Sequence, residues 1–181
     1  MALGLYTALA GLGVLWSTLA DRGIPILSPS LDRPMALETP LAWSLGAGIA
    51  LAILSLSFSA VAVRHWVRYQ RLQDAFAEML APLSHREVWV FTLSSSIAEE
   101  LFFRVGMQPS LGLWPTALIF GAIHFIPRPE FRIWTPWAIA MGVLLGAIFE
   151  YTGVAAGAIL AHGIINYVGL RGIAAHADEA D

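Results

Sequence analysis

Residues 41–63 read LAWSLGAGIALAILSLSFSAVAV, an apolar stretch that contains no Asp, Glu, Lys, Arg or His. A helix that spans the hydrocarbon core of a membrane needs about 20 consecutive, mainly apolar residues. Leu41–Val63 meets this requirement in both length and polarity. The stretch therefore predicts a transmembrane helix.

The composition of the whole chain also indicates a membrane protein. Of the 181 residues, 57% are hydrophobic and only 13% are charged, whereas a soluble domain carries about 25% charged residues. The net charge of −3 provides no basic patch for nucleic acid, so no nucleic-acid partner is expected. The chain has no cysteine, which excludes a disulfide framework, a thiolate metal site and a cysteine nucleophile.

Five further apolar stretches predict spanning helices. They are Met1–Ala20, Glu87–Gln108, Leu111–Ile126, Trp134–Tyr151 and Val154–Leu170. The first stretch lacks the basic n-region of a signal peptide, so we expect it to be a retained span. The last two are joined only by Thr152-Gly153, which predicts a tight turn. The expected fold is an all-α, polytopic membrane protein with about six transmembrane helices, in a single domain over residues 1–181.

The connection over residues 64–84 carries an amphipathic pattern. Its apolar residues recur at steps of three and four: Trp66, Tyr69, Leu72, Phe76, Met79 and Leu80. Arginines and acidic residues occupy the opposite face. The pattern predicts a helix that lies flat on the membrane surface, and a plain extension of the second span is the alternative.

The arginines indicate an orientation in the lipid bilayer, because cytoplasmic loops of membrane proteins accumulate basic residues. With six spans, the even-numbered connections hold most of them: Arg64, Arg68, Arg71, Arg86, Arg128 and Arg132. Both termini are therefore expected on the cytoplasmic side. The pairs Gly142/Gly146 and Gly153/Gly157 have the spacing that allows close helix packing, which we expect within the chain rather than between two chains.

Residues 94–106, SSSIAEELFFRVG, place three ionisable groups inside a predicted span. A charge at the bilayer centre costs about 2.5–3.5 kcal/mol on insertion scales, so these groups must face protein or water. Glu100 and Arg104 are four residues apart, in the favoured order for an ion pair along one helix face. Glu99 is rotated from Glu100 by about 100° and aligns instead with serine and threonine side chains of the same helix. We therefore expect Arg104 to neutralise Glu100, and Glu99 to act on water as a general base.

Two other predicted spans carry isolated polar residues. Phe120 and His124 are four residues apart in one span, and His162 and Asn166 are four apart in another, so each pair shares a helix face. For His124 alone, a hydrogen bond between helices is an equally good explanation. A rise of about 1.5 Å per residue places Glu99, both histidines and Asn166 at similar depths near the middle of the membrane.

This set of side chains suggests a chemistry. A carboxylate and a histidine can hold and deprotonate a water molecule, while a second histidine and an amide N–H can stabilise an oxyanion. No G-x-S-x-G motif accompanies Ser94–Ser96, so these serines are expected to line a cavity rather than to act as nucleophiles. The residues predict a hydrolase that cleaves a peptide bond with water.

Three motifs in this order resemble the CPBP family of intramembrane proteases: Glu-Glu-x-x-x-Arg at residues 99–104, Phe-x-x-x-His at residues 120–124 and His-x-x-x-Asn at residues 162–166. This family, also called Abi, contains type II CAAX prenyl endopeptidases and bacteriocin-processing or immunity proteins. The resemblance covers about residues 87–170. It implies water activation by Glu99 and His124, support of Glu99 by Glu100 and Arg104, a site shaped by Phe120, and an oxyanion hole formed by His162 and Asn166.

The resemblance also bears on cofactor, substrate and location. In a zinc-dependent version of such an enzyme, Glu99, His124 and His162 would be the metal ligands. The motif His-Glu-x-x-His is absent and Asn166 suits an oxyanion better than a metal, so we expect no metal and no other cofactor. The expected substrate is a membrane-anchored protein or peptide, with no requirement that it be prenylated. The short chain favours a small member in a bacterial inner membrane.

Two other function classes fit parts of the pattern. A non-catalytic bacteriocin-immunity or scaffold protein would keep the same residues for structure. A proton- or ion-coupled transporter would use buried glutamate and histidine to relay protons. Transporters usually contain repeats or broken helices, and no internal repeat is visible in this sequence.

Overall fold

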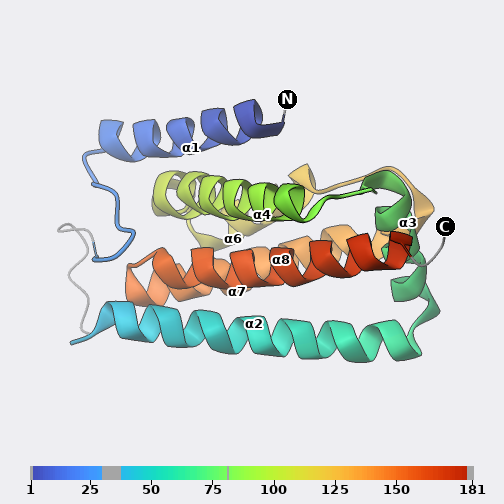
Figure 1. Cartoon of the computed structure of the whole chain (residues 1–181). Helices are drawn as coiled ribbons and strands as arrows, with labels where there is room; N and C mark the ends of the chain where they lie inside the picture. Colours follow the sequence, from blue (N-terminus) through green and yellow to red (C-terminus); the bar gives the residue numbers. More distant parts are fainter. Residues whose placement is uncertain (1, 30–37, 81, 179–181) are drawn as a thin grey trace.

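The structure is a computed structural model that describes residues 2–29, 38–80 and 82–178 (Figure 1). Its elements are α1 (Ala2–Leu19), α2 (Pro40–His65), α3 (Val67–Leu80), α4 (His85–Glu100), the π-helix η1 (Leu101–Met107), α5 (Gln108–Leu111), α6 (Leu113–Ile123), the 3₁₀-helix η2 (Pro129–Ile133), α7 (Trp134–Thr152) and α8 (Ala156–Asp178). The described residues contain no strand, so the all-α prediction is confirmed. Residues 30–37, between the first two predicted spans, lie outside the described residues.

Three helical stretches in the described part of the chain are long and apolar enough to cross a membrane. They are Pro40–His65, Pro129–Thr152 and Ala156–Ala175. Two shorter apolar helices, α1 and α6, accompany them. The protein is therefore an integral membrane protein, as predicted. The predicted span over Leu111–Ile126 is shortened to the 11 residues of α6, whereas α8 continues eight residues beyond the predicted end at Leu170.

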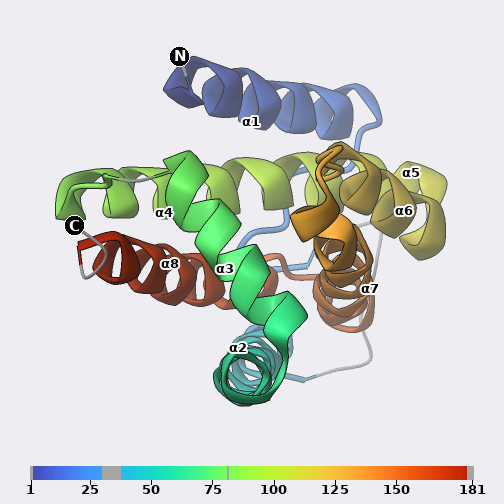
Figure 2. The same ribbon diagram turned by 90° about the vertical axis from the view of Figure 1, so that its right-hand side faces the viewer.

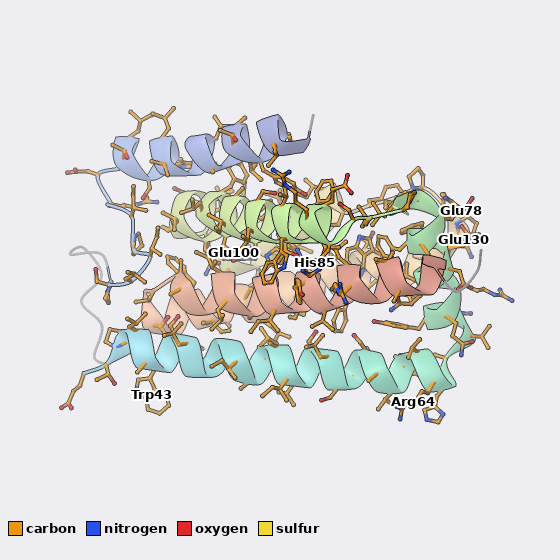
Figure 3. All side chains as sticks on the ribbon, viewed as in Figure 1. Trp43, Arg64, Glu78, His85, Glu100 and Glu130 are labelled. Carbon is orange, nitrogen blue, oxygen red and sulfur yellow. The ribbon has the colours of Figure 1, made fainter. Side chains whose placement is uncertain are left out.

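The helices are not parallel to one another. Figure 2 looks along α2, and in this view α4 crosses the picture from side to side. Helix α3 runs in front of the other helices, from the end of α2 towards the start of α4. In Figure 3, Arg64, Glu78 and Glu130 are labelled at the end of the molecule where α3 lies, and Trp43 is labelled at the opposite end.

Helix α3 is a separate element and not an extension of α2. Trp66 interrupts the helix with extended backbone angles, φ −119° and ψ 107°. The apolar face of α3 is packed against the protein, because Leu72 and Ala75 are buried. Phe76 makes edge-to-face contacts with Phe131 and Trp134, at ring-centroid distances of 4.8 and 5.0 Å. The alternative of a straight, extended second span is therefore wrong.

Local sequence signals explain where the helices around the site begin and end. Ser84 and Glu87 form a capping box at the start of α4, in which the Ser84 N–H donates to Glu87 Oε2 at 2.9 Å. Gly153 ends α7 in the left-handed conformation, φ 64°, which confirms the predicted tight turn. Two amides at the start of α8 donate to carbonyls of the loop after α1, Ala155 N–H to Pro25 and Ala156 N–H to Ile26.

Glycine allows α8 to approach α2 closely. A Cβ on Gly157 would overlap the backbone carbonyl of Ser44, and one on Gly48 would overlap Gly157. The Ser44 hydroxyl also bridges the two helices, since it accepts from the Gly157 N–H at 3.0 Å and donates to the Val154 carbonyl at 2.9 Å. Gly142 packs against Ala117 of α6 in the same way. These glycine contacts are within the chain, as predicted.

Replacing Gly157 with alanine is expected to lower the free energy of unfolding by about 1–3 kcal/mol, because the helices must separate to admit a methyl group. Gly169→Ala is the matched control on the same helix, since a Cβ there has no atom within 4 Å. Thermal unfolding in detergent measures both variants. A Tm for Gly157→Ala equal to that of Gly169→Ala would contradict this account of the contact.

Candidate active site

The polar residues singled out in the sequence come together from three helices. Glu99 lies at the end of α4, His124 directly after α6, and His162 in α8. Glu99 Oε2 is 3.7 Å from His124 Nε2 and 3.9 Å from His162 Nε2. The structure therefore places one carboxylate opposite two imidazole rings, as the estimated depths indicated.

His124 is oriented by its position at the end of α6. Its Nδ1 lies 2.6 Å from the Phe120 carbonyl oxygen. A carbonyl only accepts hydrogen bonds, so Nδ1 carries the proton and Nε2 of the neutral ring is an acceptor. The Phe120 ring lies against His124 with 4.6 Å between centroids and fixes the plane of the imidazole.

His162 is oriented by Glu100, a contact that the sequence analysis did not predict. Its Nδ1 is 2.8 Å from Glu100 Oε1. The other carboxylate oxygen, Oε2, accepts from Arg104 Nε at 2.9 Å, which confirms the predicted ion pair. Glu100 and Arg104 are both completely buried. Since the paired carboxylate is an acceptor, the proton on His162 Nδ1 points to Glu100 and Nε2 points to Glu99.

A π-helix follows Glu100 directly and carries Arg104. Its last bond runs from the Gln108 N–H to the Phe103 carbonyl, five residues back. Such wide turns are rare in proteins, and those that do occur are often found at functional sites. Gly106 in this turn packs against Gly13 of α1. The sequence predicted one uninterrupted span over Glu87–Gln108, so the π-turn is a correction to that prediction.

Gln108 is a buried polar residue whose contacts with the site the sequence analysis did not predict. Its Oε1 accepts from Arg104 Nη1 at 3.3 Å, and its Nε2 donates to the Gly146 carbonyl and to Glu150 Oε2, both at 2.9 Å. The spacing of Glu100, Arg104 and Gln108 in steps of four residues is the signal that could have identified Gln108.

The Glu99 carboxylate has an unusual environment for a buried charge. Its Oε2 atom is buried and has no hydrogen-bond partner among the described residues. The distances of 3.7 and 3.9 Å to the two Nε2 atoms are too long for direct hydrogen bonds. Separations of this size between polar atoms are suited to bridging by a water molecule.

Asn166 lies one helical turn beyond His162 on α8. Its Nδ2 donates to Ser95 Oγ at 3.0 Å. Ser95 and Ser96 are buried, and their hydroxyls donate to the Thr92 carbonyl at 3.3 and 2.7 Å. One amide hydrogen of Asn166 is thus used to hold the side chain, and the second remains for another acceptor.

A large cavity opens onto these residues. It has a volume of about 1180 Å³ and extends from the site to α3. Most of its surface is apolar, contributed by α2, α3, α7 and α8 as well as the site itself. Its polar lining at the deep end consists of Ser95, Glu99, His124, His162 and Asn166. Phe120 also lines the cavity, whereas Glu100 and Arg104 do not.

The donor geometry bears on the zinc-dependent alternative. Among the described residues, no group of three His, Cys, Asp or Glu side chains is arranged to hold a metal ion. A zinc site would need three donors about 2.0–2.2 Å from one point. Glu99, His124 and His162 do not form such a group in this structure.

Comparison with known proteins agrees with the motifs. Residues 81–168 match the family described as type II CAAX prenyl endopeptidase Rce1-like. The chain is also similar to the uncharacterized protein YpbD of Bacillus subtilis (strain 168), with 30% identity over 128 residues that cover 67% of this chain and 64% of YpbD. The match thus spans less than two thirds of YpbD. No solved structure matches the chain.

The matched segment contains each of the side chains that form the site. Glu99 and Glu100 lie near its start, His124 in its middle, and His162 and Asn166 near its end. The segment that matches the Rce1-like family model therefore holds the whole constellation of polar side chains around Glu99.

Proposed function

We propose that this chain is an intramembrane endopeptidase that hydrolyses a peptide bond with a water molecule activated by Glu99 and His124. The observation that carries the proposal is the arrangement around Glu99. A buried carboxylate oxygen with no hydrogen-bond partner in the described part of the chain faces two imidazole Nε2 atoms at 3.7 and 3.9 Å, and these side chains line a large cavity. The family match supports a protease.

The tautomer of His124 defines how the water would be held. Its Nδ1–H is donated to Phe120, so its Nε2 accepts a hydrogen bond, as does Glu99 Oε2. A water molecule between them donates one hydrogen to each, and its lone pairs then point away, towards the cavity. Glu99 takes a proton as the water oxygen bonds to the carbonyl carbon. The same proton then passes to the leaving nitrogen as the C–N bond breaks, which gives an amine and a carboxylic acid. The acid retains the second hydrogen of the water and loses it to solvent as a carboxylate forms.

The oxyanion formed in this step would be stabilised by His162 and Asn166. Because His162 Nδ1 already donates to Glu100, its Nε2 can donate to an oxyanion only when the ring is an imidazolium. Glu99 Oε2 and Glu100 Oε1 lie on either side of the ring, 3.9 Å from its Nε2 and 2.8 Å from its Nδ1. The free amide hydrogen of Asn166 is the second donor.

The cavity indicates the kind of substrate. Its apolar lining suits a membrane-anchored protein or peptide whose extended backbone reaches Glu99 from the side of α3. If the arginine-rich connections are cytoplasmic, this is the cytoplasmic side of a bacterial inner membrane. A prenyl group on the substrate is not required by this geometry.

The first test is cleavage of a library of membrane-anchored peptides by the purified protein in nanodiscs, with and without a strong chelator. Cleavage that survives the chelator and is absent in Glu99→Gln supports a water activated by glutamate. Loss on chelation, restored by zinc, supports the metal-dependent alternative. If wild type and Glu99→Gln both leave every peptide intact, an immunity or scaffold role is favoured over a protease.

Asn166→Ala is expected to lower kcat by about 10²- to 10³-fold with little change in KM, because an oxyanion donor acts mainly in the transition state. Steady-state cleavage of the best library peptide measures both constants. Ser95→Ala provides a comparison, since it removes the acceptor that holds Asn166 but keeps the amide. An unchanged kcat in Asn166→Ala would exclude Asn166 from the oxyanion hole.

A further inference from the structure

Behind the site, a row of buried polar side chains continues away from the cavity. His162 Nδ1 contacts Glu100, Glu100 contacts Arg104, and Arg104 contacts Gln108, at 2.8, 2.9 and 3.3 Å. Gln108 is 1% exposed and does not line the large cavity, so it cannot touch a substrate there. Its position nevertheless bears on the orientation of His162.

The ion pair alone does not fix the Arg104 guanidinium. Only Nε reaches the Glu100 carboxylate, and Nη2 is buried without a hydrogen-bond partner among the described residues. A bidentate pair would set the plane of the guanidinium, but this contact through one nitrogen does not. Two further contacts of the guanidinium are with the Phe120 ring, 5.4 Å from the guanidinium carbon, and with the Gln108 amide.

Gln108 is itself held rigidly. Its Nε2 donates to the Gly146 carbonyl and to Glu150 Oε2, both on α7. Its backbone N–H closes the last turn of the π-helix. Gly146 leaves just enough room for this arrangement, because a Cβ at that position would lie 2.8 Å from Gln108 Oε1 and 3.1 Å from Arg104 Nη1.

We infer that Gln108 is a positioning residue for the reaction assigned above. It holds Arg104 against Glu100, and Glu100 in turn keeps Nε2 of His162 directed at Glu99 and the oxyanion. The inference rests on the proposed endopeptidase activity for its kinetic consequence. Its structural part, the dependence of the His162 ring on Gln108, is independent of any activity.

The kinetic test uses Gln108→Met, which keeps the length of the side chain, removes its side-chain hydrogen bonds and leaves the backbone bond to Phe103 in place. The variant is expected to lower kcat by about tenfold to a hundredfold, the effect of a small misplacement of catalytic groups. KM is expected to stay within about twofold of wild type, because Gln108 does not contact the cavity. In Gly146→Ala, the added methyl group on α7 would displace the Gln108 side-chain amide. This variant is expected to show the same loss of kcat with unchanged KM.

Thr152→Val is the matched control for a purely structural effect. It removes a buried hydroxyl from the same end of α7, where Thr152 Oγ1 donates to the Ile148 carbonyl at 2.6 Å. We expect it to lower Tm without changing kcat. If Gln108→Met has a kcat within about twofold of wild type, or lowers only Tm as Thr152→Val does, the positioning role is overturned.

A second readout does not depend on cleavage. Protein labelled with ¹⁵N-histidine and held in detergent micelles gives an imidazole spectrum, in which the His162 signals are assigned by their loss in His162→Gln. The chemical shifts of the His162 Nδ1–H and Nε2 signals are expected to change in Gln108→Met and to remain those of wild type in Thr152→Val. Unmoved signals overturn the inference. If wild type cleaves no peptide, the proposed function fails, while the His162 signals still decide whether Gln108 positions this ring.

Discussion

Glu99→Gln is expected to lower kcat for peptide cleavage by about a thousandfold, within the range for loss of a general base. Glutamine has the same shape and keeps one oxygen near the two imidazole rings, but it cannot take a proton from water. The loss should appear in kcat rather than in KM, because the substrate backbone still finds the same cavity. Steady-state cleavage of the preferred peptide in nanodiscs measures both constants.

The same substitution is expected to leave the protein at least as stable as wild type. Glu99 Oε2 is buried without a hydrogen-bond partner among the described residues, so a neutral side chain removes an unfavourable desolvation. Thermal unfolding checks this directly. Glu78→Gln is the control for a carboxylate remote from the site, because Glu78 is on the exposed face of α3 and its side chain is 70% exposed. Cleavage by Glu99→Gln at the wild-type rate would remove Glu99 from the mechanism.

Arg104→Met is expected to have the largest effect on stability, a loss of about 3–5 kcal/mol in the free energy of unfolding. Both members of the Glu100–Arg104 pair are completely buried, and removing the arginine leaves the glutamate charge without its cation. His162 still donates to Glu100, but this one hydrogen bond does not replace the buried guanidinium. Yield and thermal unfolding in detergent measure the loss.

The double variant Glu100→Gln/Arg104→Met separates charge from packing. With no buried charge left over, it is expected to recover most of the stability lost in Arg104→Met, as double-mutant cycles show for coupled residues. It should remain inactive, because glutamine no longer fixes the proton on His162 Nδ1. An Arg104→Met variant as stable as wild type would show that Glu100 is not charged in the folded protein.

The sequence predicted those contacts that depend on short-range spacing. The Glu100–Arg104 pair follows from a separation of four residues, and the turn at Gly153 follows from a two-residue connection between apolar stretches. The meeting of Glu99 with His124 and His162 followed from their similar depths, because helices that cross a membrane share one length scale. These are the features for which local geometry is sufficient.

Other features depend on neighbours that are distant in the sequence. The bond from His162 to Glu100 joins residues 62 positions apart, and spacing within one helix contains no information about it. The spacing of four residues from Arg104 could have identified Gln108, but its bond to Gly146 joins residues 38 positions apart and has no such signal. The π-turn after Glu100 has the composition of an ordinary apolar helix. The separation of α3 from α2 at Trp66 was likewise ambiguous from periodicity alone.

The shortness of α6 has a consequence for where cleavage takes place. Eleven residues extend at most about 16 Å, roughly half of the 30 Å hydrocarbon core, and His124 lies directly beyond the last of them. In the proposed mechanism, with the start of α6 taken at the membrane surface, the number of residues in α6 sets the depth of the reacting water in the bilayer. A peptide bond in the headgroup region would have to move inward to reach it, whereas one already located about halfway across would not. Selection among anchored substrates then depends on how far each bond lies from its membrane anchor.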